Sequence, residues 1–215
     1  AYEPFGAIPF PMGNTGQQMA GWFNKPITAA TDLDGLKMRI PGLGGKVFAK
    51  AGGNAVLLAG SEVYTSLERR TIDATEWIGP FHDLRLGLNR AAEHYYYPGW
   101  HEPGTVLELL VNTEAWDSLG PDLQRMVETA AAAANVRILA RMDAANARAL
   151  AQLQAAGRVN IDALPPDVLA DLRRFTREAL AEEAGRNDKF AAVMAAYEAF
   201  REQMQAWQDI GGHAY

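Results

Sequence analysis

Hydrophobic and polar residues alternate in short runs over the first half of the chain, with the period of two that is typical of half-buried strands. In the clearest run Leu36, Met38 and Ile40 alternate with Lys37 and Arg39, and Pro41 with Gly42 ends it. Similar runs predict further strands, at 8–11, 55–58, 74–77, 94–97 and 105–112.

Helical patterns separate these strands. Helices are predicted at 43–51, 61–70 and 80–92, and a shorter one at 17–23, where it follows a glycine-rich loop and would present free N–H groups. Strands that alternate with helices of about ten residues are typical of an α/β domain with a mainly parallel sheet. In such sheets ligands bind beyond the carboxyl ends of the strands.

The second half of the chain is mostly helical. A long alanine-rich helix is predicted at 121–156, a short strand at 158–164, and two more helices at 165–185 and 188–209. The last helix carries an apolar stripe at helical spacing, consisting of Phe190, Val193, Met194, Tyr197, Phe200, Met204 and Trp207. This stripe fits either packing against the rest of the same chain or pairing with a second copy. The tail 211–215 is expected to be loose.

Composition narrows the function classes. The 215 residues are 48% hydrophobic, enough for one large domain or two modest ones, and the formal net charge of −6 without a basic run argues against nucleic acid. Without cysteine there is neither a disulfide frame nor a thiolate zinc site. No apolar run is long enough for a membrane span, and the first residues lack the pattern of a signal peptide. The abrupt start predicts that an upstream segment, including any export signal, is missing.

Two charged residues stand out at predicted strand ends. Arg39 is either a surface charge paired with an acidic residue or a clamp whose planar guanidinium holds a carboxylate through two charge-assisted hydrogen bonds. Glu76 beside Trp77 is either solvated or the ligand of a hard cation. Oxygen ligands suit sodium or calcium better than zinc.

The other candidate groups carry less information. The histidines show no metal-binding spacing, and only His101, within a Gly/Pro turn, is a candidate site residue; His82, His94 and His213 fit surface or structural roles. Neither a nucleophile elbow nor a phosphate-binding loop is present, and Ser61 and Thr75 have no evident partner histidine.

Four segments carry a resemblance to a known family: GLKMRIPGLGGKV, SEVYTSLERRTIDATEWIGPFHDL, YYYPGWHEPGT and LELLVNTEAWDSL. Together they resemble the solute-binding subunit of TRAP (tripartite ATP-independent periplasmic) transporters, in the branch that binds 2-oxo acids and lactate. The resemblance runs in order from about Met12 to the C-terminus.

The resemblance implies an α/β fold of the periplasmic-binding-protein type (type II), with a mixed, mainly parallel sheet, long bracing helices and most of the N-terminal domain outside this chain. It divides the chain into a crossing strand and entry to the second domain (1–31), the first part of that domain (32–75), a crossing segment with a remnant of the first domain (76–112), and the bracing and C-terminal helices (113–215).

Roles for individual residues follow from the resemblance. Arg39 matches the carboxylate clamp, Glu76 the acidic cation ligand, and Trp77 adds its carbonyl and ring to the site. Gln18 matches a residue that reaches both ligand and cation, with Gln17 as the rival if the register shifts by one. His101 is expected to face the ligand and tune selectivity.

The predicted function is therefore the capture of a small monocarboxylate, pyruvate- or lactate-like, with sodium or calcium, in the periplasm and without enzymatic activity or an organic cofactor. Arg39 and a monovalent cation would neutralise Glu76 and one ligand carboxylate. The expected partners are the TRAP membrane subunits and, through the C-terminal helix, a second copy of the chain. The alternatives are a sensor domain or an enzyme on the same scaffold.

Overall fold

The structure, a computed structural model, describes residues 2–211. Its elements are, in chain order, the 3-10 helix η1 (Glu3–Phe5), β1 (Ala7–Asn14), β2 (Gly21–Phe23), the 3-10 helix η2 (Ala30–Leu33), β3 (Lys37–Arg39), α1 (Gly42–Lys50), β4 (Asn54–Val56), α2 (Gly60–Glu68), β5 (Ala74–Thr75), α3 (Pro80–Leu86), α4 (Leu88–Ala91), β6 (His94–Tyr97), β7 (Val106–Asn112), α5 (Thr113–Asp117), α6 (Pro121–Ala156), β8 (Asn160–Ala163), α7 (Pro166–Arg186) and α8 (Asp188–Gly211).

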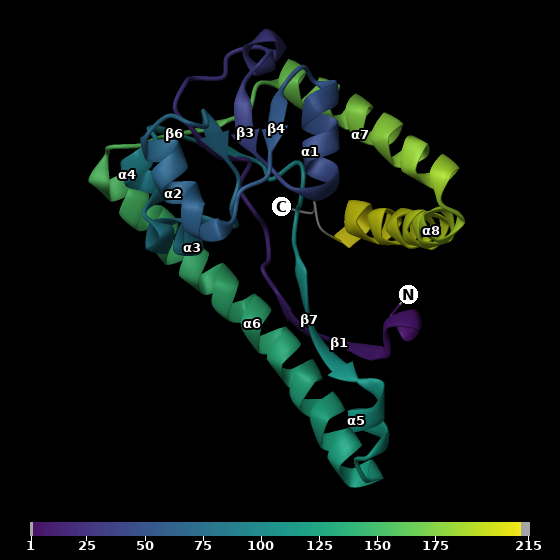
Figure 1. The fold of residues 1–215 in the computed structure, drawn as a ribbon. Coiled ribbons are helices and arrows are strands. Elements are labelled where there is room, and N and C mark those ends of the chain that lie inside the picture. The colour runs from purple at the N-terminus through teal and green to yellow at the C-terminus, as the bar shows by residue number, and fades with distance from the viewer. Residues whose placement is uncertain (1, 212–215) are drawn as a thin grey trace.

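A six-stranded sheet with its helices forms the body of the molecule (Figure 1). The strand order is β4-β3-β5-β2-β6-β8. Three neighbouring pairs are parallel, β3 with β4, β3 with β5 and β6 with β8, whereas β2 runs antiparallel to both β5 and β6. The expected α/β fold with a mixed, mainly parallel sheet is confirmed.

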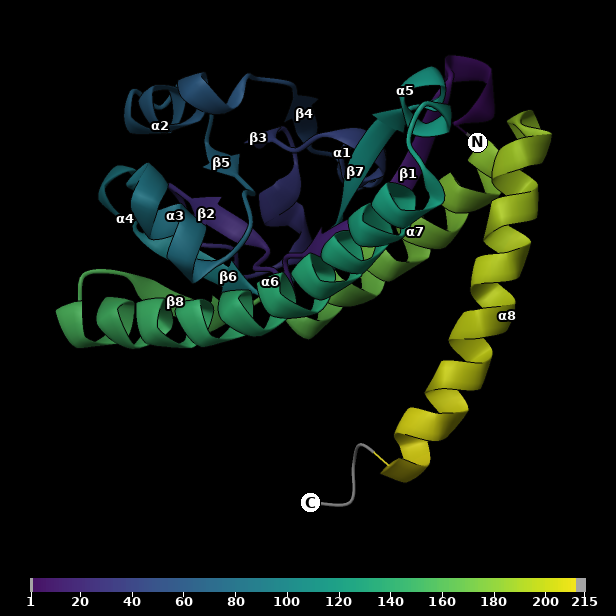
Figure 2. The ribbon, with the colours of Figure 1, turned by 90° about the horizontal axis from the view of Figure 1, so that it is seen from below.

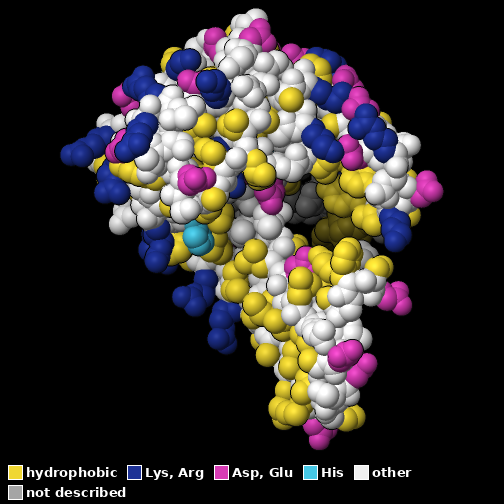
Figure 3. Space-filling model, in the orientation of Figure 1, with side chains coloured by type: hydrophobic (Ala, Val, Ile, Leu, Met, Phe, Trp, Pro, Cys, Tyr) yellow, Lys and Arg dark blue, Asp and Glu magenta, His cyan; other side chains and the backbone are white. Residues whose placement is uncertain are grey.

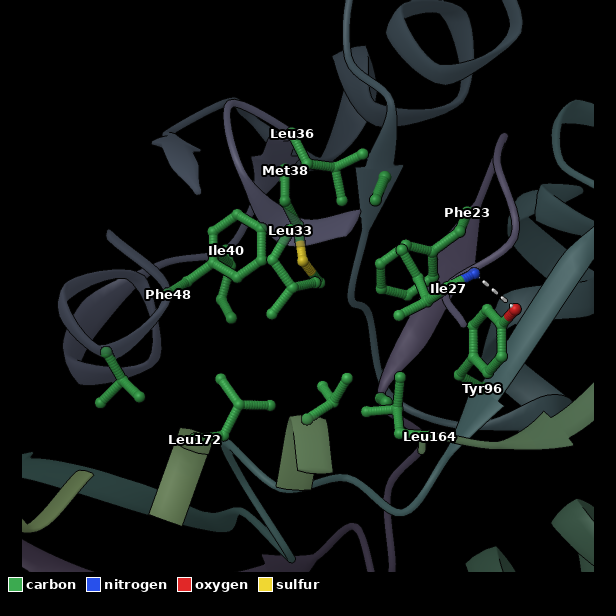
Figure 4. Packing of buried hydrophobic residues seen from close by; sticks show 14 of the residues in the cluster. Phe23, Ile27, Leu33, Leu36, Met38, Ile40, Phe48, Tyr96, Leu164 and Leu172 are labelled. Atoms are coloured by element: carbon green, nitrogen blue, oxygen red, sulfur yellow. Dashed lines mark hydrogen bonds between the residues drawn. The ribbon is translucent and has the colours of Figure 1, made fainter. Parts of the chain in front are cut away.

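Apolar side chains cover both faces of this sheet. On one face Met38 and Phe48 pack with Leu172 of α7, and Tyr96 accepts a hydrogen bond from the backbone N–H of Ile27 at 2.9 Å (Figure 4). On the other face the indole of Trp22 stacks on Tyr95, with 4.0 Å between the ring centroids, within a cluster that also holds Val63, Leu67, Leu88 and Leu153. Each fully buried large side chain contributes about 1.5–3 kcal/mol to folding.

A narrow limb leaves the body. It consists of the antiparallel pair β1 and β7, helix α5 and the N-terminal half of α6, which lies along β1 (Figures 1 and 2). Large apolar side chains are exposed there, among them Val106 at 56%, Leu110 at 53% and Met126 at 64%. The six strands of the body come from all four segments into which the chain was divided, 1–31, 32–75, 76–112 and 113–215. The assignment of these segments to domains stays a prediction.

Two of the predicted helices differ from the structure. The prediction of a helix at 17–23 is wrong, because Gly21–Phe23 forms the buried strand β2. Gly21 has φ +133°, and a Cβ there would lie 2.4 Å from the carbonyl oxygen of Thr75, so the backbone is extended and pressed against β5. The helix predicted at 80–92 is divided into α3 and α4 by Gly87, which has φ +82°.

The other predicted strands and helices are present within a few residues of their predicted bounds, including the long helix α6 over Pro121–Ala156, whereas α5 and the two 3-10 helices were not predicted. Helix α8 extends away from the body and has no buried residue over Asp188–Gly211 (Figure 2). Gly211, expected to begin a loose tail, is the last residue of α8, and residues 212–215, which include His213, lie outside the described residues. Within the described part of the chain, none of the helices is both long and apolar enough to cross a membrane.

Candidate functional site

Arg39 is positioned by the end of strand β3. The alternation along β3 buries Met38 in the core at 1% exposure and turns Arg39 to the other face. Pro41 and Gly42 then start α1, so the strand stops directly after the arginine. Arg39 lies opposite Val56 of β4 and Thr75 of β5, both in parallel strands.

Glu76 directly follows β5, and the parallel register brings it to the same edge of the sheet as Arg39. Its backbone N–H donates to the carbonyl oxygen of Arg39 at 3.3 Å. The side chains meet as an ion pair, in which Arg39 Nη1 donates to Glu76 Oε1. The side chain of Arg39 is 13% exposed and that of Glu76 only 3%, so the pair is largely removed from water.

His101 reaches the same carboxylate from the loop between β6 and β7. Its Nε2 lies 3.4 Å from Glu76 Oε2, and its side chain is 3% exposed. Neither ring nitrogen makes a hydrogen bond within the described chain. The Cβ atom of His101 lies next to Gly44 in the first turn of α1, where an added Cβ would come within 3.1 Å of it.

Glu102 completes the cluster, and the sequence analysis missed it. Oxygen or nitrogen atoms of Glu76, His101 and Glu102 lie within 4.8 Å of one another, close enough to hold one metal ion. Glu102 accepts a hydrogen bond from the hydroxyl of Thr105. The sequence did contain a signal for this residue, because Glu102 directly follows His101 in the Gly/Pro turn. The search for metal-binding motifs considered only the spacing of histidines and therefore did not include it.

Gln18 is connected to this cluster through Thr105. Its amide nitrogen donates to the hydroxyls of Thr105 at 2.9 Å and Thr15 at 3.1 Å, and its residue is 6% exposed. The amide oxygen is buried without a partner in the described chain. Gln17 is exposed, and it lines with Gln18 a cavity of about 950 Å³ against α6. Of the two rivals, Gln18 is the one whose contacts lead to the cluster.

Trp77 supplies the apolar wall. The guanidinium carbon of Arg39 lies 5.3 Å from the centre of the indole, within the range of a cation–π contact. The ring rests against Gly60 at the start of α2, where a Cβ would come within 2.8 Å of Trp77 Cη2. Any side chain at Gly60 would therefore displace the wall.

We call Arg39, Glu76, Trp77, His101 and Glu102 the strand-edge cluster. It contains two carboxylates and one guanidinium. Of the six buried side-chain nitrogen and oxygen atoms without a hydrogen-bond partner in residues 2–211, four belong to Gln18, Arg39 and His101. Since buried polar groups in folded proteins are nearly all paired, their concentration here indicates a site built for a polar ligand.

Asp83 supports the segment that carries Glu76, and it too escaped the sequence analysis. Its carboxylate accepts hydrogen bonds from Trp22 Nε1 at 2.9 Å, from the Tyr95 hydroxyl at 2.8 Å and from the backbone N–H of Ile78 at 3.2 Å. Burial raises the pKa of Asp83 to about 6, against these hydrogen bonds, which lower it. The pKa of Tyr95 is raised by burial and by the neighbouring Asp83 charge.

Comparison with known proteins identifies the family of the chain. The model of the bacterial extracellular solute-binding protein family 7 (DctP) matches residues 5–186. The chain therefore belongs to this family, and the resemblance to TRAP solute-binding subunits is confirmed.

A curated relative is the monocarboxylate 2-oxoacid-binding periplasmic protein of Nostoc sp., 43% identical over 214 residues that cover 100% of this chain and 58% of the relative. Two solved structures of TRAP periplasmic solute-binding proteins each cover 100% of this chain. That from Colwellia psychrerythraea, with bound calcium and pyruvate, has a TM-score of 0.95 and 40% identity. That from Pseudoalteromonas atlantica, with bound sodium and pyruvate, has a TM-score of 0.94 and 41% identity. The chain spans 65% of each of these two structures.

Proposed function

We propose that this chain is the ligand-binding part of an extracytoplasmic solute-binding protein that captures a small 2-oxo or 2-hydroxy monocarboxylate together with a cation. The single observation that carries the proposal is the strand-edge cluster, in which Arg39 and the buried Glu76 meet where the parallel strands β3 and β5 end, beside the half-buried Glu102, with several polar atoms unpaired in the described chain. The relatives that bind 2-oxo acids or pyruvate support this ligand class.

Arg39 is the proposed clamp for the ligand carboxylate. Its planar fork can donate two parallel hydrogen bonds to a carboxylate, and Nε has no partner in the described chain. In the structure the fork is directed at Glu76. When a cation binds Glu76, the Coulomb attraction between Glu76 and Arg39 is compensated, and the guanidinium becomes available to the ligand.

The cation ligands proposed are the carboxylates of Glu76 and Glu102, the amide oxygen of Gln18 and the backbone carbonyl of Trp77. All are hard oxygen donors, which suit sodium or calcium. His101 then faces the ligand and contributes to its selection.

Glu102 changes the charge accounting of the site. With Glu76 alone, a monovalent cation and Arg39 balance one monocarboxylate. With Glu76 and Glu102 both ionised, a monocarboxylate and Arg39 leave two negative charges, which one divalent cation neutralises. We therefore favour calcium over sodium for this chain, and a monocarboxylate over a dicarboxylate.

Affinity requires that the ligand be enclosed. A ligand of about six non-hydrogen atoms, at the ceiling of about 1.5 kcal/mol per atom, reaches about 9 kcal/mol, or a dissociation constant below about 1 μM. One wall of a cleft cannot contact every atom. We propose that the limb, with its exposed Val106, Leu110 and Met126, continues into a further domain of the whole protein that supplies the facing wall.

Delivery to the membrane subunits of a TRAP transporter in the periplasm completes the proposal. A homodimer through α8 belongs to it as well, because α8 buries none of its own residues and exposes Tyr197, Phe200 and Trp207 at 56–66%. Sedimentation of the protein at high concentration tests this interface: a dimer that Trp207→Glu dissociates supports it, and a monomer under all conditions contradicts it.

Calorimetry tests the central claim. After chelator treatment, the whole protein is titrated with pyruvate in the presence of calcium, of sodium, or of neither. Tight binding only with calcium supports the proposal, whereas cation-independent binding removes the cation from it. Conversion of the ligand into a product, detected by NMR, would favour an enzyme instead.

A further inference from the structure

A second cavity, of about 630 Å³, lies between α3 and the middle of α6, and no residue of the strand-edge cluster lines it. Helix α3 contributes Phe81 and His82, and α6 contributes Arg137, Arg141 and Arg148. Figure 2 shows α3 against α6, and in Figure 3 Lys or Arg side chains follow the outer edge of α6 below a histidine. The volume lies within the range of small-molecule sites.

The positive charges of the three arginines that line this cavity are not balanced by neighbouring acidic side chains in the described part of the chain. Within residues 2–211 none of them forms an ion pair, although exposed arginines elsewhere, such as Arg125 and Arg174, pair with carboxylates three or four residues away. The one acidic residue between 137 and 148 is Asp143, whose carboxylate lies against Gly16 and lines the other cavity. Unpaired positive charges thus gather in one place on a chain with net charge −6.

The spacing of the arginines defines the shape of a ligand. Arg137 and Arg141 are one helical turn, about 6 Å, apart along α6, so both can donate to one carboxylate. Arg148 lies about 10 Å further along the axis. Small alanines stand between them, and the side chains of Ile138 and Met142 make the lining apolar.

His82 adds an independent polar group. Its Nδ1 is buried without a hydrogen-bond partner in the described chain. Burial lowers the pKa of His82, and the positive charge of Arg85 lowers it further. The guanidinium carbon of Arg85 lies 5.5 Å from the ring centre of Phe81, which places a fourth positive charge beside the cavity.

We propose that this cavity binds an elongated organic dianion, with one carboxylate between Arg137 and Arg141, an apolar body over the alanines, and the second carboxylate near Arg148. Arginine is suited to this task because its fork matches a carboxylate bidentately. This site is separate from the proposed monocarboxylate site and does not depend on it.

Octanedioate is the probe, because its six methylene groups separate two carboxylates over a comparable length. Calorimetry of the whole protein is expected to show binding that weakens at least tenfold in the double variant Arg137→Gln/Arg141→Gln. The matched control Arg125→Gln changes an exposed arginine of the same helix and should leave the affinity unchanged. Arg39→Gln should also leave it unchanged, which separates this site from the strand-edge cluster.

NMR titration of the His82 imidazole gives a second readout. A bound dianion stabilises the imidazolium form, so the pKa of His82 is expected to rise when octanedioate is added. If the double variant fails to fold, shown by circular dichroism, Arg148→Gln takes its place with the same expected loss.

Three results would overturn the proposal. The first is the absence of octanedioate binding, or equal affinity in the folded arginine variant and the wild type. The second is loss of binding in Arg39→Gln, which would assign octanedioate to the strand-edge cluster. The third is equal affinity for butanedioate, because a shorter dianion cannot span the arginines.

Discussion

Glu76 and Asp83 are two carboxylates seven residues apart, both almost fully buried, at 2% and 1% exposure. Asp83 is surrounded by neutral donors, those of Trp22, Tyr95 and Ile78. Glu76 is surrounded by charged or titratable groups, those of Arg39, His101 and Glu102, and unpaired polar atoms lie around it. The hydrogen-bonded carboxylate of Asp83 contributes to the fold, whereas the charged and incompletely paired cluster around Glu76 is the proposed ligand site.

The largest effect is expected from Arg39→Gln. A neutral amide cannot replace two charge-assisted hydrogen bonds, so pyruvate affinity of the whole protein should fall at least 1000-fold, or about 4 kcal/mol, by calorimetry. Lys37→Gln, an exposed position on the same strand, is the control and should bind normally. Affinity within tenfold of the wild type in Arg39→Gln would rule out the clamp.

Removing Arg39 also leaves Glu76 buried without its ion-pair partner, which should reduce the free energy of unfolding by about 3–5 kcal/mol. The double variant Arg39→Met/Glu76→Gln should recover stability without recovering binding. Recovery of binding in that variant would mean that the charges do not recognise the ligand.

Asp83 should affect stability and its pH dependence. Its folded-state pKa, about 6, lies above the ordinary value of 3.8, so the folded protein holds this proton more tightly than the unfolded chain. The resulting stability is fully present below pH 3.8 and is lost as the pH rises through about 6. Two pKa units correspond to about 3 kcal/mol.

Urea unfolding at several pH values tests this expectation. In Asp83→Asn the decrease in stability between pH 4 and 6 should be smaller than in the wild type by about 2 kcal/mol, the part of the total that falls within this pH range. The exposed Asp34→Asn serves as the control and should retain the wild-type slope. An unchanged slope in Asp83→Asn would show that this carboxyl titrates normally.

Glu102→Gln tests whether the strand-edge cluster holds a divalent cation. Loss of one carboxylate ligand should weaken calcium binding about 10- to 100-fold and reduce the preference for calcium over sodium, measured by calorimetry after chelation. Glu93→Gln, an exposed position before β6, should change neither property. Equal calcium affinity in Glu102→Gln and the wild type would remove Glu102 from the site.

The smallest effect is expected from Gly60→Ala. The new methyl group would meet the Trp77 ring within 2.8 Å, so the wall should shift and ligand affinity should fall by about threefold. Gly185→Ala in α7 meets no atom within 4 Å and should increase helix stability by up to about 1 kcal/mol. Identical ligand binding in Gly60→Ala and the wild type would show that the position of Trp77 is not critical.

The sequence alone brought Arg39 and Glu76 into one hypothesis, because each lies at the end of a strand of a predicted parallel sheet. Strand alternation is a local signal, and the parallel rule then places both at one edge. It did not find Glu102 or Asp83. Acidic residues are common in turns and on helices, so the sequence pattern does not single out Glu102 or Asp83. Their contacts in the folded chain do, since Glu102 accepts a hydrogen bond from Thr105 and Asp83 accepts one from Tyr95.

The sequence by itself determined the strand at Arg39, the helix at Pro121–Ala156, the α/β class and the family. The reason is that all four depend on signals carried by residues close together in the chain: the hydrophobic period, the positions of glycine and proline, and long sequence motifs. Tertiary structure decided that Gly21–Phe23 is a central strand, since the backbone of β2 pairs with β5 and β6. It also decided which buried carboxylate stands among charges, because Coulomb interactions depend on distances that only the folded chain sets.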